Sequence, residues 1–206
     1  LVRSQMTTVF DLRCLRVDWL NRMGADPNLE REWLRKTAAG DRSAFEQLYH
    51  AFHRRIFGYL FRMLSNVEAA EEAAGDVMLE VWKAAGGFRG ESQVSTWIFG
   101  IARFKALSIL RRTRQDMVGA EEVEQFRDPH ELPDQVLVRD SMKASIKKAL
   151  ARLSPEHREV MELTFYQEFS YPEIAKLLGC PVNTIKTRMF YARKQLRELL
   201  SAEGAS

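Results

Sequence analysis

The segment 183–194 carries hydroxyl, aromatic and cationic side chains beside apolar positions that repeat every three or four residues. Arginine and lysine bind backbone phosphates, and threonine and aromatic side chains contact base edges in a major groove. These residue types therefore indicate recognition of duplex DNA rather than catalysis. The candidate contact residues are Thr184, Lys186, Thr187, Arg188, Phe190, Tyr191 and Arg193.

Two short predicted helices must position these side chains, and they meet at a turn around Gly179. A glycine suits a turn that needs positive φ, and Pro181 suits the first turn of the next helix. The predicted inward positions are Ile174, Ala175, Leu178, Val182, Ile185 and Met189. This spacing predicts a helix-turn-helix. The alternative is a helical hairpin with a solvated basic face, but Ala175, Gly179 and Ile185 together favour the DNA-binding motif.

A second group of candidate nucleic-acid residues lies upstream, on a helix predicted over 97–114. Trp97 and Phe104 share a stripe that is interleaved with Arg103, Arg111 and Arg112. Because rings stack on unpaired bases while cations follow phosphates, this stripe suits single-stranded nucleic acid. The alternative is that both rings pack in the core; the pattern leaves this open for Phe104 and favours partial exposure of Trp97. The predicted core stripe is Phe99, Ala102, Ala106, Ile109 and Leu110.

Helical periodicity also marks the preceding part of the chain, with helices predicted over 29–39, 45–64 and 67–85. Capping and glycine-rich pairs at 40–41, 65–66 and 86–87 separate them. The middle helix has an apolar stripe made of Phe45, Leu48, Tyr49, Phe52, Ile56, Leu60 and Leu64. The third has an acidic outer face that is free for a protein partner, made of Glu68, Glu71, Glu72, Asp76 and Glu80.

Two helical domains emerge from these patterns, because no strand alternation appears and periodicity stops after Arg114. Between residues 113 and 135, seven acidic residues face two arginines, which gives 2 − 7 = −5, although the chain has a net charge of +3. This composition predicts a flexible acidic linker that lets the domains lie far apart. The predicted organisation is all-α: an N-terminal extension with poor order (1–28), a first domain (29–113), the linker (114–135) and a second domain (136–206).

Composition excludes several classes of function. The two cysteines, Cys14 and Cys180, have no nearby second sulfur, which argues against a disulfide framework or zinc site and fits a reducing cytoplasm. His50 and His53 lack a third metal ligand. No apolar run is long enough to cross a membrane. Without a phosphate loop, nucleophile motif or metal set, we expect no enzyme activity, no cofactor and no metal.

Several motifs resemble the group 4, or extracytoplasmic function (ECF), sigma factors of bacterial RNA polymerase over nearly all of 29–200. In the first domain they are AEEAAGDVMLEVW at 70–82, FRGES at 88–92 and TWIFGIAR at 96–103. In the second they are LSPEHREV at 153–160, FSYPEIA at 169–175 and CPVNTIKTR at 180–188. Each motif alone is moderately specific for the family, whereas the order and spacing of all six together are highly specific for it.

The resemblance implies that the two domains are sigma regions 2 and 4, which bind core RNA polymerase and promoter DNA. Region 2 would melt and hold the −10 element, through Arg89, Ser92 and Ser95 of a base-capturing loop and the Trp97–Arg112 stripe. Region 4 would bind the −35 element. The expected partners are the clamp helices of the largest polymerase subunit, the flap of the second largest subunit, and an anti-sigma factor. The clamp helices would contact Glu72, Asp76 and Glu80.

Two positions depart from the family pattern. Gly75 stands where glutamine is usual on the clamp-binding helix, and Phe104 stands where asparagine is common on the −10 helix. Stacking by Phe104 would then replace hydrogen bonding. A competing hypothesis is a stand-alone helix-turn-helix regulator whose N-terminal domain senses a ligand or dimerises; such a regulator needs no single-strand surface and no long linker.

Overall fold

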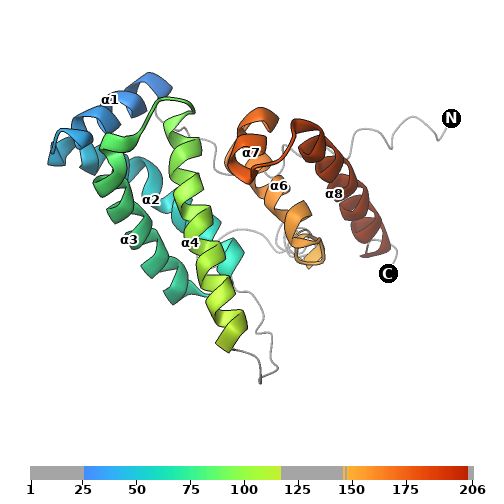
Figure 1. Cartoon of the computed structure of the whole chain (residues 1–206). Helices are drawn as coiled ribbons and strands as arrows, with labels where there is room; N and C mark the ends of the chain where they lie inside the picture. Colours follow the sequence, from blue (N-terminus) through green and yellow to red (C-terminus); the bar gives the residue numbers. More distant parts are fainter. Residues whose placement is uncertain (1–25, 117–145, 147, 204–206) are drawn as a thin grey trace, which may run out of the picture.

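The computed structural model of the chain describes residues 26–116, 146 and 148–203, and Figure 1 shows their arrangement. The first group of helices comprises α1 (Pro27–Ala38), α2 (Arg42–Leu64), α3 (Val67–Ala84), the short 3₁₀ helix η3 (Ala85–Gly87) and α4 (Val94–Asp116). The second comprises α6 (Pro155–Phe165), α7 (Tyr171–Leu178) and α8 (Val182–Glu203). We call these groups the first and second domains. The described residues contain no strand, which confirms the all-α prediction.

Side-chain caps begin several of these helices. The carboxylate of Asp41 accepts a hydrogen bond from the Ala44 N–H at 3.1 Å, and Asn66 accepts one from the Ala69 N–H at 2.7 Å. At the start of α6 the Ser154 hydroxyl accepts from the His157 N–H at 3.3 Å. Each cap satisfies an N–H that has no partner within its own helix.

The core of the first domain forms around α2, which α1, α3 and α4 contact. The predicted stripe is buried at its centre, and Phe57 and Phe61 are buried beside it, so α2 is covered on more than one side. Placing Tyr49 in that stripe was wrong: it is 36% exposed. Its ring instead stacks on His53 of the next turn, with centroids 4.6 Å apart.

Helix α4 differs from the prediction at both ends. It begins at Val94, three residues before the predicted start, and buries Ile98 with Phe99. Leu110 was wrongly assigned to the core and is 38% exposed, because the last turns of α4 extend past the neighbouring helices (Figure 1). The helix runs to Asp116, so the first residues assigned to the linker are helical. The rest of the predicted linker, 117–135, lies outside the described residues.

The second domain packs α6 and α7 against α8 and contains the predicted helix-turn-helix. Gly179 adopts the left-handed conformation at φ 65°, as its place in the turn requires. Pro181 precedes α8 rather than lying in its first turn, and its carbonyl accepts from the Thr184 N–H at 2.9 Å. Ile185 and Met189 are buried as predicted.

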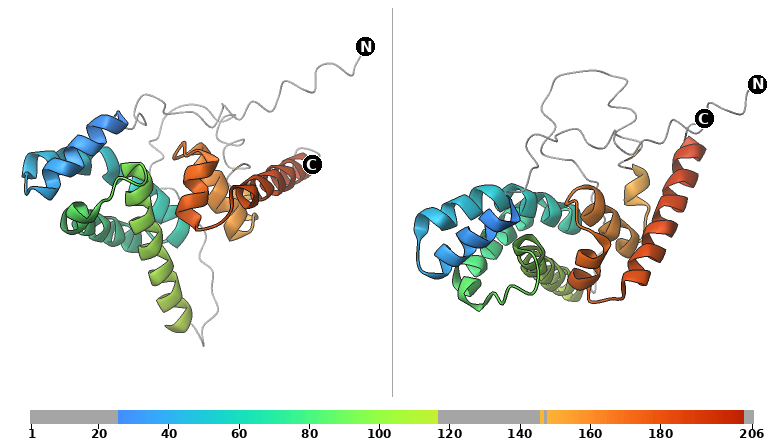
Figure 2. Two further views of the ribbon diagram at one scale, coloured as in Figure 1. Left: turned by 45° about the horizontal axis from the view of Figure 1, so that its top comes forward. Right: turned by 90° about the horizontal axis from the view of Figure 1, so that it is seen from above.

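The two domains contact each other, which the sequence does not predict. Helices α6 and α7 lie beside α2 and α4 in the views of Figures 1 and 2. The rings of Phe99 on α4 and Phe169 before α7 meet edge to face, with centroids 5.2 Å apart. The structure therefore holds a closed arrangement rather than two separated domains. None of the described helices is long and apolar enough to cross a membrane.

Candidate nucleic-acid interfaces

The outer face of α8 carries every side chain that the sequence assigns to duplex recognition. Lys186, Thr187 and Arg193 are exposed, and Thr184 and Arg188 are half-buried. The other two are exposed aromatic residues, Phe190 at 64% and Tyr191 at 51%. Because buried positions fix the opposite face of α8 against α6 and α7, this outer face is presented as one continuous surface.

Helix α7 supports α8 through a reciprocal cap at its own start. The Ser170 N–H donates to Oε2 of Glu173 at 2.8 Å, and the Ser170 hydroxyl donates to the same oxygen at 2.5 Å. Ile174 and Ala175 are buried against the domain core. Helix α7 therefore has a defined start and a buried face, and the left-handed turn at Gly179 leads from it into α8.

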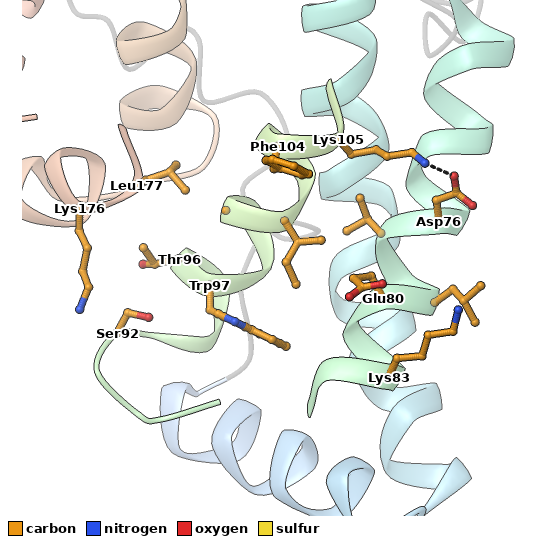
Figure 3. A pocket seen from close by; sticks show the side chains of 14 residues that line it. Asp76, Glu80, Lys83, Ser92, Thr96, Trp97, Phe104, Lys105, Lys176 and Leu177 are labelled. Carbon is orange, nitrogen blue, oxygen red and sulfur yellow. Dashed lines mark ion pairs between the residues drawn. The ribbon is translucent and has the colours of Figure 1, made fainter. Parts of the chain in front are cut away.

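A groove of about 790 Å³ lies along α4, between α3 and α7 (Figure 3). Trp97 and Phe104 both line it, as their shared stripe predicts. Phe104 is 72% exposed, so it is a surface ring rather than a core residue. Trp97 is half-buried and packs on Phe88, with ring centroids 5.4 Å apart. Two aromatic faces in an open groove are suited to stacking on bases.

The loop before α4, together with the first turn of α4, forms one end of this groove. Ser92 and Thr96 line it, Ser95 is half-buried and Arg89 is exposed. The Oγ1 atom of Thr96 is buried and has no hydrogen-bond partner among the described residues. Lys176 of α7 donates from Nζ to the Glu91 carbonyl, which ties the second domain to this loop.

The arginines of α4 do not gather around the groove. Arg103 turns toward the second domain, where its Nε donates to Oε1 of Glu159 at 2.8 Å. Arg112 is exposed on the side of α3, in a hollow that Glu72 and Asp76 also line, and the preceding residue, Arg111, is exposed outside that hollow. The two rings of the predicted single-strand stripe therefore lie together in the groove, whereas its cations lie on different sides of α4.

The acidic outer face of α3 is present, with Glu72 and Glu80 exposed. Asp76 is half-buried and forms an ion pair with Lys105 of α4 (Figure 3). Sequence reasoning predicted Asp76 but missed Lys105. A Cβ atom added at Gly75 would meet nothing within 4 Å, so this face is open at that position. Among the described residues no group of histidine, cysteine, aspartate and glutamate is arranged to hold a metal ion.

Polar contacts between the domains are the largest feature that sequence reasoning missed. The Tyr59 hydroxyl of α2 donates to Oε1 of Glu159 at 3.0 Å, and Arg62 donates to Oε1 of Glu162 at 2.6 Å. Burial, with the charge of Glu159 adding to it, raises the pKa of Tyr59 well above its usual value, which keeps it a hydrogen-bond donor. Nothing in the spacing of these residues pairs them, because each pair is 100 positions apart.

Comparison with known proteins identifies both domains. The family model "Sigma-70 region 2" matches residues 48–115, and "Sigma-70, region 4" matches 143–196. The chain is 35% identical to the ECF RNA polymerase sigma factor RpoE of Cereibacter sphaeroides over 164 residues, which covers 78% of this chain and 88% of that protein. It is 28% identical to the RNA polymerase sigma-H factor of Pseudomonas aeruginosa over 180 residues, covering 83% of this chain and 93% of that one.

Among solved structures, the fold is similar to the sigma factor RpoE bound to the anti-sigma factor NepR from Bartonella quintana. The TM-score is 0.63 at 29% identity, over 76% of this chain and 96% of that one. It is also similar in fold to CnrH in complex with the cytosolic domain of CnrY, with a TM-score of 0.62 at 24% identity, over 84% of this chain and 98% of that one.

Proposed function

The chain belongs to the ECF RNA polymerase sigma factors, and we propose that it directs core RNA polymerase to promoters through two separate DNA contacts. The first domain (29–113) acts as region 2, which melts and holds the −10 element. The second domain (136–206) acts as region 4, whose helix-turn-helix binds the −35 element. The protein supplies recognition, works in the cytoplasm with the polymerase and has no catalytic site of its own.

The observation that carries this proposal is the exposure of Phe104 beside Trp97 in the α4 groove. A ring that is 72% exposed contributes little to the core, so its value lies in what binds it. Stacking of a base on an aromatic ring contributes about 1–3 kcal/mol, which offsets the few kcal/mol that unstacking a base costs. A protein that only bound duplex DNA would gain nothing from this surface.

The duplex contact is assigned to the outer face of α8. Lys186, Thr187, Phe190 and Tyr191 face the bases of the −35 element, and Thr184, Arg188 and Arg193 bind nearer the phosphates. The resemblance to the family implies this division, and the exposure of the first four on one helix face supports it; Thr184 and Arg188 are half-buried at the edges of that face, and Arg193 is exposed. The arrangement matches a recognition helix lying in a major groove.

The acidic face of α3 is assigned to the clamp helices of the largest polymerase subunit, with Glu72 and Glu80 as the free contacts. Region 4 also meets the flap of the second largest subunit. An anti-sigma factor regulates the protein; the similar RpoE of Bartonella quintana was solved with one, NepR.

Abortive initiation with purified core polymerase on a promoter library tests this function. We expect short transcripts that start at defined positions and require both the polymerase and this protein. A control with the triple variant Glu72→Lys, Asp76→Lys, Glu80→Lys should give none. If no core enzyme from the same source yields a promoter-dependent transcript while duplex binding persists, the protein is instead a stand-alone helix-turn-helix regulator.

A further inference from the structure

Helix α6 of the second domain presents two carboxylates to the first domain. Glu159 accepts hydrogen bonds from Tyr59 of α2 at 3.0 Å and from Arg103 of α4 at 2.8 Å. One turn further along α6, Glu162 accepts from Arg62 of α2 at 2.6 Å. The two carboxylates therefore engage two helices of the other domain at once.

These contacts are largely withdrawn from solvent. The side chains of Glu159 and Glu162 are 13% and 7% exposed, and those of Arg103 and Arg62 are 26% and 34% exposed. Charged hydrogen bonds that are shielded from water are stronger than the exposed ion pairs of a protein surface. The Arg62 guanidinium also lies over the ring of Tyr166, 4.6 Å from its centroid.

The same closed arrangement brings α7 to the edge of the α4 groove. Leu177 and Lys176 line the groove together with Trp97 and Phe104, as Figure 3 shows. The Leu177 Cδ1 atom lies 3.8 Å from the position of a Cβ added to Gly100, so the two helices are in close contact there. With α7 in this position, one side of the groove is closed by the second domain.

We propose that the second domain holds the protein in a self-inhibited closed state, in which the Glu159 carboxylate takes the place of a DNA phosphate on Arg103. This inference rests on the proposed function, because it concerns access to the −10 strand. A guanidinium Nε–H that donates to Glu159 is not free for a phosphate, and α7 narrows the groove where the bases would stack. Binding of single-stranded DNA therefore requires the domains to separate.

If only open molecules bind single strands, the apparent association constant is the intrinsic constant multiplied by the fraction of molecules that are open. A variant that opens the protein should gain that factor without any new DNA contact. The variant Glu159→Lys places a cation against Arg103 and removes the acceptor of Tyr59. Glu198→Lys is its matched control, because Glu198 is exposed on α8 and the change of charge is the same.

Two measurements on the full-length protein test the closed state. Small-angle X-ray scattering should show a larger radius of gyration for Glu159→Lys than for the wild type and Glu198→Lys. Fluorescence anisotropy with a labelled mixed-sequence DNA strand of about 20 nucleotides should show roughly threefold to tenfold tighter binding by Glu159→Lys than by Glu198→Lys. Equal dimensions and equal affinities of the two variants would overturn the proposal.

A steric variant provides a test that leaves every charge unchanged. Gly100→Phe adds a ring against Leu177 and should also increase the radius of gyration. Gly75→Phe is its control, because Gly75 is exposed on α3 and a Cβ added there meets nothing within 4 Å. If Gly100→Phe and Glu159→Lys both match the wild type in size, the closed state does not exist in solution. The scattering needs neither polymerase nor promoter, so a failure of the proposed function in transcription would remain distinct from a failure of this proposal.

Discussion

The guanidinium Nε of Arg103 on α4 lies 2.8 Å from Oε1 of Glu159 on α6, across the boundary between the two domains. The same carboxylate oxygen accepts a hydrogen bond from Tyr59 of α2, so one side chain joins three helices. Arg103 belongs to the stripe that the sequence assigns to single-stranded DNA. Its role in the described structure is thus to bind another part of the same chain.

The two DNA surfaces should respond separately to mutation. Lys186→Ala removes an exposed cation from the recognition face of α8 and should weaken binding of −35 duplex about tenfold, a loss of roughly 1 kcal/mol or more. Trp97→Ala should leave duplex binding unchanged but reduce open-complex formation. Electrophoretic shift of the −35 duplex and permanganate footprinting of the −10 region measure the two effects. Equal loss of duplex binding in both variants would contradict the division of labour.

Phe104→Ala should reduce open-complex formation by about 1–3 kcal/mol, because it removes a stacking ring. Its effect on folding should be within about 0.5 kcal/mol, since the ring is 72% exposed. Phe104→Tyr keeps the ring and should keep most of the activity. Permanganate reactivity of the −10 region, with thermal unfolding as the control, checks both outcomes; strong destabilisation by Phe104→Ala would mean that the ring is structural.

Glu80→Lys should weaken binding to core polymerase severalfold or more, because it reverses an exposed charge on the surface assigned to the clamp helices. Glu46→Lys on α2 is the matched control, since Glu46 is also exposed and lies outside that surface. Fluorescence anisotropy of labelled protein titrated with core polymerase measures both affinities. Equal affinities of the two variants would remove Glu80 from the interface.

Gly179→Ala should destabilise the second domain by about 1–2 kcal/mol, because φ at this position is 65° and an alanine there is strained. Hydrogen exchange of the α7 and α8 amides should become faster. In contrast, Gly75→Ala should stabilise the first domain by about 1 kcal/mol, because Gly75 lies inside α3 with free space around it. Tryptophan fluorescence during urea unfolding reports on that domain, since no tryptophan follows Trp97.

The first domain should lose stability as the pH rises toward 7. Burial raises the pKa of Glu30 from 4.5 to about 7, with Asp26 adding to the rise and Arg55 opposing it. Between these values the folded domain keeps a proton that the unfolded chain releases, so this stabilisation is complete below about pH 4.5 and is lost as the pH rises through 7. The loss should be about 1–3 kcal/mol.

Glu30→Gln should remove this dependence, because an amide does not titrate. The variant should therefore gain stability relative to the wild type between about pH 5 and pH 8. Urea unfolding followed by tryptophan fluorescence at both pH values measures the difference. If the wild type and variant change in parallel with pH, Glu30 is not the group responsible.

Local patterns were enough to predict the helices, their caps and the recognition face of α8. Asn66 caps α3 as expected, because a cap depends on residues two or three positions away. Periodicity was less reliable where a helix lacks neighbours along part of its length. Leu110 follows the core stripe of α4 but is exposed, since the last turns of α4 have little to pack against.

The sequence by itself determined the family motifs, the all-α class and the two candidate DNA surfaces, because each depends on residues close together along one helix. Only the tertiary structure decided that Phe104 is exposed while Arg103 is paired with Glu159. These two neighbours on α4 differ because one faces an open groove and the other faces α6. Residues that are 56 or 100 positions apart come together through packing, and no local spacing in the sequence encodes that meeting.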